Sequence, residues 1–253
     1  RKRVFEVRDP LMRHLLVGQL EARVFSLVHE AAKIESEPQR IVGRVVIVDS
    51  NTRLAVVNNV FIQPRRDRGR RSTKARDGSV LWRNAWPGRT AVIPTPIVHR
   101  NEVYISSGYG AGCRKITVGG ANEVTEDYSN KNMKNKHGGV LLLKGHLYGY
   151  SDGRGWTCQS LKSGDVVWDS KKFGKGCVFY ADNRLYCLEE SSGQVALAAA
   201  DTGGWKEHGR FKLEPQTELR KSSGRVWTHP VVANGVMYLR DQELLFAFDV
   251  KAR

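Results

Sequence analysis

Several side chains that could bind a ligand stand next to short apolar segments that recur along the chain. Lysine and arginine supply positive charge for an anion or a carboxylate, and histidine supplies a donor that titrates near neutral pH. The candidate ligand-binding residues are Arg89, Thr95, His137, Lys175, Trp227 and His229. The alternative is structural, because His137 and His229 could instead satisfy backbone groups at the starts of strands.

The same residues are a poor basis for a metal site or for catalysis. Zinc normally takes three or four protein ligands, so the two histidines form an incomplete set. The sequence shows no nucleophile with a matching base, no phosphate-binding loop and no metal-binding signature. We therefore expect neither a catalytic residue nor a metal ligand among the candidates.

The cysteines do not have the spacing of a metal site. They are Cys113, Cys158, Cys177 and Cys187. None is adjacent to another, and no Cys-x-x-Cys pair occurs. We expect buried free thiols, since a bridge between Cys177 and Cys187 would require an oxidising compartment.

The elements that must position the candidates are repeats of a four-stranded unit. Residues 138–168 contain four short apolar or aromatic segments separated by turns, as in four antiparallel strands. A tyrosine in the second segment recurs as Tyr104, Tyr148, Tyr186 and Tyr238, with spacings of 44, 38 and 52 residues. A propeller blade has a period of roughly 40 to 50 residues. A β-sandwich also has many short strands, but it does not explain the recurring tyrosine.

We therefore predict an all-β protein, a β-propeller of four-stranded blades with four visible repeats in a small or incomplete ring. The first strand of each blade lines the central channel, so the residues just before these strands meet at one mouth of the channel. Thr95, His137, Lys175 and His229 occupy these positions, with Arg89 and Trp227 close by.

The first and last parts of the repeat region complement each other. Residues 76–82 match residues 162–168 and have the pattern of a last strand, whereas the final repeat stops after its third strand. We expect Ser79–Arg83 to pair with Leu244–Phe248, which would close the ring without an exposed sheet edge.

Residues 1–63 are predicted to form a separate appendage. The spacing of apolar residues between Pro10 and Glu37 predicts an amphipathic helix, and residues 41–49 and 54–62 predict a hairpin. Residues 64–76 hold seven basic residues and one acidic residue, which predicts a disordered or solvated linker before the propeller repeats of residues 77–253. A phosphate-binding arm is the alternative, but no aromatic side chain is interleaved for base stacking.

The positive charge is concentrated near the N-terminus. Of the net charge of +15, residues 1–76 contribute 17 basic and 8 acidic residues. No apolar stretch approaches the roughly 18 residues of a membrane-spanning helix. The chain begins with Arg rather than Met, so we expect a fragment or a processed form, in which a targeting signal would not be visible.

The repeats resemble the quinoprotein-type, or pyrroloquinoline-quinone-like, β-propeller repeats of secreted bacterial proteins of the kind that planctomycetes carry. The resemblance rests on the Ser-Gly-Asp-Val-Val-Trp segment at 163–168 and on residues 89–96, 106–113, 136–139, 227–230 and 239–242. It covers residues 76–250 and leaves out residues 1–63. It implies a periplasmic or secreted location.

Proteins of this fold differ in activity. They include quinone-dependent alcohol and polyvinyl-alcohol dehydrogenases and non-catalytic scaffolds such as the outer-membrane assembly lipoprotein. For the dehydrogenases, the resemblance implies eight blades, calcium held by acidic and amide groups, an aspartate base and commonly two adjacent cysteines against the quinone. This sequence departs from that pattern, and Asp127, Asp152 and Asp241 stand where turns or strand ends would put them anyway.

The favoured prediction is a non-catalytic binding or scaffold module that uses no cofactor and holds a protein or a small anionic ligand at the channel mouth. An incomplete ring would allow an oligomer. The first alternative is an alcohol dehydrogenase that depends on pyrroloquinoline quinone (PQQ) and calcium. The second is phosphate or nucleic-acid binding through residues 64–76.

Overall fold

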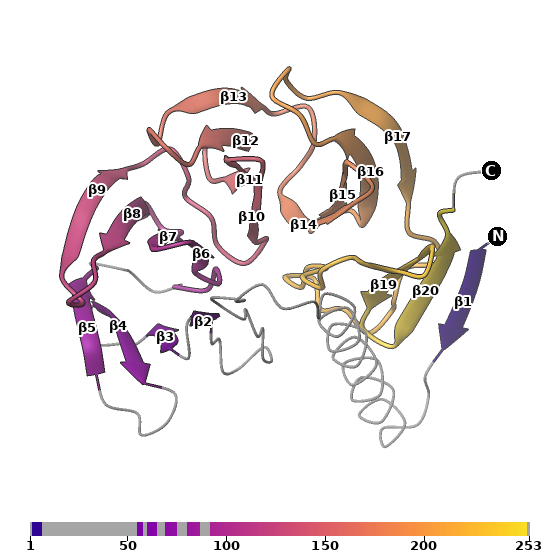
Figure 1. Ribbon diagram of the computed structural model, residues 1–253. Helices are drawn as coiled ribbons and strands as arrows, with labels where there is room; N and C mark the ends of the chain where they lie inside the picture. The colour runs from indigo at the N-terminus through magenta and orange to yellow at the C-terminus, as the bar shows by residue number, and fades with distance from the viewer. Residues whose placement is uncertain are drawn as a thin grey trace.

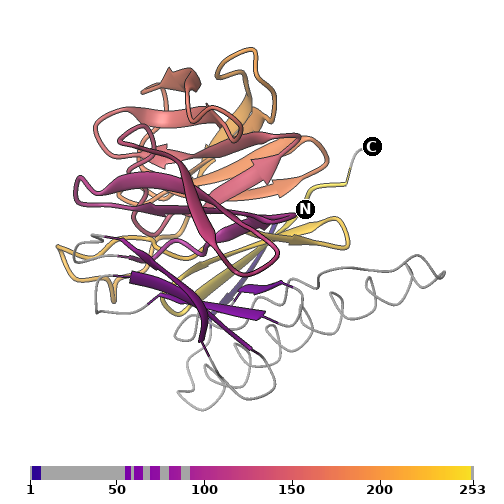
Figure 2. The same ribbon diagram turned by 60° about the vertical axis from the view of Figure 1, so that its left-hand side comes forward.

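The computed structural model describes residues 2–6, 55–57, 60–64, 69–74, 80–86 and 92–251. These residues form twenty β-strands in five antiparallel sheets of four strands each. The sheets stand radially about a common axis, with their first strands near the centre (Figures 1 and 2). The prediction of an all-β propeller with four-stranded blades is confirmed.

Four of the blades are continuous in sequence. The first contains β2 (Ala55–Val57), β3 (Val60–Pro64), β4 (Gly69–Lys74) and β5 (Val80–Ala85). The second contains β6 (Ile97–His99), β7 (Glu102–Ser107), β8 (Gly112–Val118) and β9 (Val124–Asn130). The third contains β10 (Val140–Leu143), β11 (His146–Ser151), β12 (Gly155–Ser160) and β13 (Val166–Ser170). The fourth contains β14 (Gly176–Ala181), β15 (Arg184–Glu189), β16 (Gln194–Ala199) and β17 (Glu207–Lys212).

The fifth blade joins the two ends of the chain. It contains β18 (Val231–Ala233), β19 (Val236–Asp241) and β20 (Leu244–Asp249), and its fourth strand is β1 (Lys2–Glu6). Strand β1 pairs along β20 with Lys2 opposite Phe248 and Glu6 opposite Leu244. The Lys2 ammonium also donates a hydrogen bond to the Glu214 carbonyl oxygen, which ties β1 to the loop after β17.

The recurring tyrosine occupies the same place in four different sheets. It is the third residue of the second strand in each blade, and it pairs with a residue of the first strand. The pairs are Ile97 with Tyr104, Leu141 with Tyr148, Phe179 with Tyr186, and Val231 with Tyr238. The predicted repeat is therefore the structural repeat.

Tight turns fix the register of the first two strands in several blades. Lys144 and Gly145 both have positive φ values (49° and 78°), and so do Asp182 and Asn183 (48° and 56°). Two consecutive residues with positive φ are typical of the type I′ turn, whose twist matches that of a two-strand hairpin. Asparagine, aspartate and glycine tolerate this conformation better than other residues do.

The core lies between the blades rather than within one sheet. Buried side chains from neighbouring blades share hydrophobic clusters: Tyr104 and Leu147 belong to one, Trp156 and Leu185 to a second, and Leu188 and Leu239 to a third. Each burial removes apolar surface from water, which stabilises the radial arrangement.

The prediction of how the ring closes names the wrong strand. Residues 80–83 belong to β5, which pairs with β4, so Trp82 stands opposite Ser72 and not opposite the last repeat. The match to residues 162–168 identified a genuine outermost strand, but this strand completes its own blade. Strand β1 completes the fifth blade, and its short sequence carries no copy of the repeat pattern.

The first blade also differs from the prediction for residues 54–76. The predicted strand 54–62 is two strands, β2 and β3, which pair with each other. The basic segment contains β4, which pairs with β3 and β5, whereas its composition predicts a linker. The predicted helix between Pro10 and Glu37, the predicted strand 41–49 and Arg89 lie outside the described residues.

Candidate functional site

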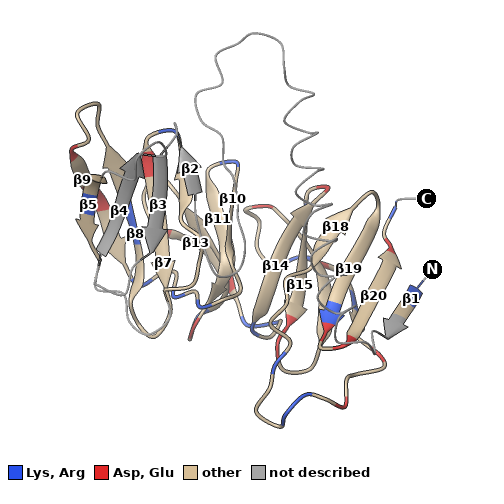
Figure 3. Cartoon of the chain, turned by 90° about the horizontal axis from the view of Figure 1, so that it is seen from below, with Lys and Arg blue, Asp and Glu red and all other residues tan. Residues whose placement is uncertain are grey.

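The first strands of neighbouring blades contact one another around the axis, from β2 to β6, β10, β14 and β18. Because first and second strands are antiparallel, the start of one and the end of the other lie at the same end of the sheet. We call this end of the propeller the mouth. Strands β10 and β14 carry no charged residue (Figure 3).

A close approach of two backbones brings the third and fourth blades together at the mouth. The Val178 amide donates a hydrogen bond of 3.1 Å to the Gly138 carbonyl oxygen. A Cβ atom on Gly138 would lie 2.1 Å from the Gly176 carbonyl oxygen, nearer than van der Waals contact allows. The sequence therefore needs glycine at position 138.

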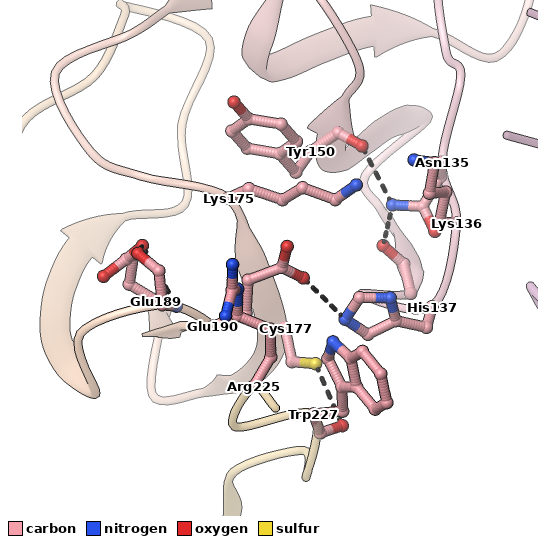
Figure 4. A network of polar contacts seen from close by, with 12 residues as sticks. Asn135, Lys136, His137, Tyr150, Lys175, Cys177, Glu189, Glu190, Arg225 and Trp227 are labelled. Atoms are coloured by element: carbon pink, nitrogen blue, oxygen red, sulfur yellow. Dashed lines mark hydrogen bonds and ion pairs between the residues drawn. The ribbon is translucent and has the colours of Figure 1, made fainter. Parts of the chain in front are cut away.

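His137 lies at the junction of three blades (Figure 4). Its Nε2 atom is 3.0 Å from the Glu190 Oε2 atom, and both atoms are buried. Its ring meets the Trp227 ring edge to face, with 5.6 Å between the centroids. These contacts connect the third blade to the fourth through Glu190 and to the fifth through Trp227.

His229 makes the structural contact that was the alternative to a ligand site. Its Nε2 atom lies 2.8 Å from the His137 carbonyl oxygen. Its Cε1 atom would lie 3.1 Å from a Cβ atom on Gly139, so the missing side chain at Gly139 gives the ring its room. His229 therefore connects the fifth blade to the third.

Lys175 bonds to Asp152, a residue that sequence reasoning did not place at this site. The Lys175 Nζ atom lies 2.8 Å from Asp152 Oδ1, and the Lys136 Nζ atom lies 3.3 Å from Asp152 Oδ2. Burial of the ammonium lowers the pKa of Lys136, but the Asp152 carboxylate outweighs this effect and raises it. Lys136 is therefore charged at neutral pH.

Trp227 presents the largest exposed apolar side chain near this cluster. Its side chain is 58% exposed, although its ring is held against His137. Its carbonyl oxygen accepts a hydrogen bond of 3.4 Å from the Cys177 thiol, which fixes the backbone beneath the ring. A fixed and exposed indole is suited to bind an apolar group.

The structure brings together His137, Trp227 and His229, and Lys175 lies beside them in the close-up view (Figure 4). Thr95 is exposed just before β6, and no contact joins it to this cluster in the described part of the chain. Sequence reasoning missed Lys136, Asp152 and Glu190. Asp152 and Glu190 could have been found from the sequence, because each directly follows a second strand. Residues in that position lie at the mouth together with the residues that precede first strands.

The residues present do not fit a quinone held by calcium. Asp152 is bonded to two lysines, Asp241 to Arg220 and Asp127 to Thr117, so these carboxylates already have partners. No group of three His, Cys, Asp or Glu side chains stands together as metal ligands within the described ranges.

The four cysteines are buried free thiols, as predicted. Cys177 pairs with Leu188 and Cys187 pairs with Val178 across the same two strands. Adjacent strand residues point to opposite faces of a sheet, so the two thiols cannot form a bridge. Burial raises the pKa of Cys158 to about 11 and that of Cys177 to about 12.

Comparison with known proteins identifies a family. A family model described as outer membrane protein assembly factor BamB matches residues 29–170. No curated protein matches the chain. Among the residues that the structure describes, none forms a helix long and apolar enough to cross a bilayer.

Solved structures with the same fold are propellers of low sequence identity. BamB from Moraxella catarrhalis has a TM-score of 0.56 and 12% identity, and the match covers 84% of this chain and 60% of that one. The computationally designed Ika8 protein has a TM-score of 0.57 and 8% identity, with coverage of 78% and 57%. The WD40 propeller domain of Doa1 has a TM-score of 0.50 and 16% identity, with coverage of 78% and 63%. This chain thus spans less than two thirds of each of these structures.

Proposed function

Because this chain belongs to the family described as outer membrane protein assembly factor BamB, we propose that it is a non-catalytic module that binds a protein partner at the mouth. Members of one fold differ in function, so the proposal must rest on the site. Its support is Trp227, whose indole is 58% exposed while its backbone and ring edge are held by Cys177 and His137.

An aromatic anchor of this kind is typical of a protein interface. Tryptophan is enriched among the few residues that contribute most of the binding energy, and a fixed side chain loses little entropy on binding. The nearby lysines supply donors at the rim of such an anchor. An extended segment of a partner could place an apolar side chain on Trp227 and polar groups on these donors.

The family membership also supports a proposed location in the bacterial periplasm. Fractionation of cells that express the full gene would test it, with a periplasmic signal expected and a cytoplasmic one contradicting the proposal.

Selection of displayed random peptides on the immobilised chain tests the proposed function. We expect enriched peptides to lose about thirtyfold in affinity for the Trp227→Ala variant, as at an interface hot spot. Val167→Ala is the matched control, because Val167 is exposed on the outer strand β13. Peptides that bind both variants equally well would contradict a site at the mouth. Alcohol-dependent dye reduction after addition of pyrroloquinoline quinone and calcium would contradict the non-catalytic assignment.

A further inference from the structure

Two lysines from neighbouring blades share one carboxylate at the mouth. Lys175 precedes β14, Lys136 precedes β10, and each bonds to a different oxygen of Asp152, which follows β11. We call Lys136 and Lys175 the lysine pair. An ammonium has three donors, so each lysine keeps donors beyond the one that Asp152 accepts.

A third lysine lies near this carboxylate. Lys134 also reaches the turn that contains Asp152, because its Nζ atom would lie 3.5 Å from a Cβ atom on Gly153. Three lysine side chains therefore lie at or beside this turn, and Glu189 and Glu190 are the other carboxylates close enough to act on the neighbouring Tyr150. Asp152 accepts one contact from each ammonium of the lysine pair, so further donors of the pair remain for an outside anion.

Packing holds the lysine pair in place before any ligand arrives. The stem of Lys136 passes so close to Gly108 that a Cβ atom there would lie 2.3 Å from its Cγ atom. The Lys136 Nζ atom lies 4.3 Å from the centre of the Tyr109 ring, a cation–π contact. The side chains of Lys136 and Lys175 remain 28% and 23% exposed. The ammonium groups are thus positioned and still reachable from water, which lowers the entropy cost of binding.

We infer that the lysine pair binds a carboxylate of the partner segment, from an aspartate or glutamate side chain or from its C-terminus. This inference rests on the proposed function, because it assigns the polar contact that accompanies the apolar contact at Trp227. The carboxylate accepts hydrogen bonds from both ammonium groups while Asp152 holds them near each other, and such charge-assisted bonds are stronger than neutral ones.

Fluorescence anisotropy of fluorescein-labelled octaglutamate with the full chain tests this site. We expect Lys136→Gln and Lys175→Gln each to weaken binding by about tenfold, as for the loss of a hydrogen bond to a charged group. Lys162→Gln is the matched control, since it removes the same charge from an exposed loop at the other end of β12. It should change the affinity by less than about twofold, because exposed charges contribute little. Unchanged thermal midpoints would show that all three variants fold.

The results separate this inference from the proposed function. Equal losses in all three variants, or no binding of octaglutamate, would overturn the carboxylate site. Free glutarate is the second competitor. If it displaces the labelled peptide as well as unlabelled octaglutamate does at the same carboxylate concentration, the site does not require a protein segment, and that part of the inference would be overturned. Selected peptides that need Trp227 but neither lysine would overturn the carboxylate site and leave the proposed function standing. Octaglutamate that needs both lysines, with no selected peptide that needs Trp227, would support the carboxylate site and contradict the proposed function.

Discussion

The Nε2 atom of His229 lies 2.8 Å from the backbone carbonyl oxygen of His137, 92 residues earlier in the chain. A carbonyl oxygen only accepts, so this nitrogen donates. The bond joins the fifth blade to the third at the mouth, beside the ring contact between His137 and Trp227.

Replacing His229 with alanine should therefore lower the free energy of unfolding by about 1 kcal/mol, the usual net contribution of one hydrogen bond. His229→Gln keeps a side-chain donor and should restore part of the loss. Chemical denaturation measures both values. Equal stability of the alanine variant and the wild type would show that the bond does not hold the blades together.

Gly138→Ala should destabilise the protein by about 1–3 kcal/mol, as overpacking does, because the added Cβ atom would lie 2.1 Å from the Gly176 carbonyl oxygen. Gly120→Ala is the matched control, since nothing lies within 4 Å of its Cβ position. The difference between their denaturation midpoints is the measurement. A Gly138→Ala variant as stable as the control would mean that β10 and β14 are farther apart than described.

The sequence allowed the second to fifth blades to be predicted because each carries a tyrosine as the third residue of its second strand. The first blade has no such tyrosine, its strand β2 has three residues, and β4 contains two arginines and a lysine. The basic segment forms strand β4 because it pairs with β3 on one side and β5 on the other. Its amino-acid composition alone could not indicate this pairing.

The candidate site was predictable where it depended on the starts of first strands, as for His137, Lys175 and His229. Asp152 and Glu190 were missed because each contacts a side chain from another blade, Lys175 for Asp152 and His137 for Glu190. Such a contact follows from the angle between sheets, for which the sequence carries no local signal.

Strand β1 should be needed for stability, because without it β20 would be an exposed edge. Val4→Pro removes a backbone donor within β1 and should cost up to about 3 kcal/mol, whereas Val4→Thr keeps the strand propensity and should cost less. Thermal unfolding and light scattering would record the loss and the resulting aggregation. Identical melting of the proline and threonine variants would mean that β1 does not complete the fifth blade.

The four thiols should be inert in the folded protein. All four are buried, and burial raises the pKa of Cys158 to about 11. We expect no reaction with Ellman's reagent at pH 8 in native buffer and four thiols per chain in denaturant. Rapid reaction of any thiol without denaturant would contradict the packing between blades.

Alkaline pH should destabilise the fold for the same reason. Burial first, and the nearby Glu190 charge second, raise the pKa of Cys177 from 9.0 to about 12. Between these values the unfolded state loses its proton and the folded state keeps it, so the free energy of unfolding falls as pH rises. Cys177→Ala should flatten this decline between pH 9 and pH 12. If the free energy of unfolding declined with pH as steeply in Cys177→Ala as in the wild type, the Cys177 thiol would be exposed to water rather than buried.

The account depends most on the claim that a partner segment binds at the mouth with its apolar side chain on Trp227. Calorimetric titration of one selected peptide into the wild type, Trp227→Ala and Val167→Ala tests it directly. We predict an affinity about thirtyfold lower for Trp227→Ala and unchanged for Val167→Ala. Equal affinity for all three proteins would contradict the claim.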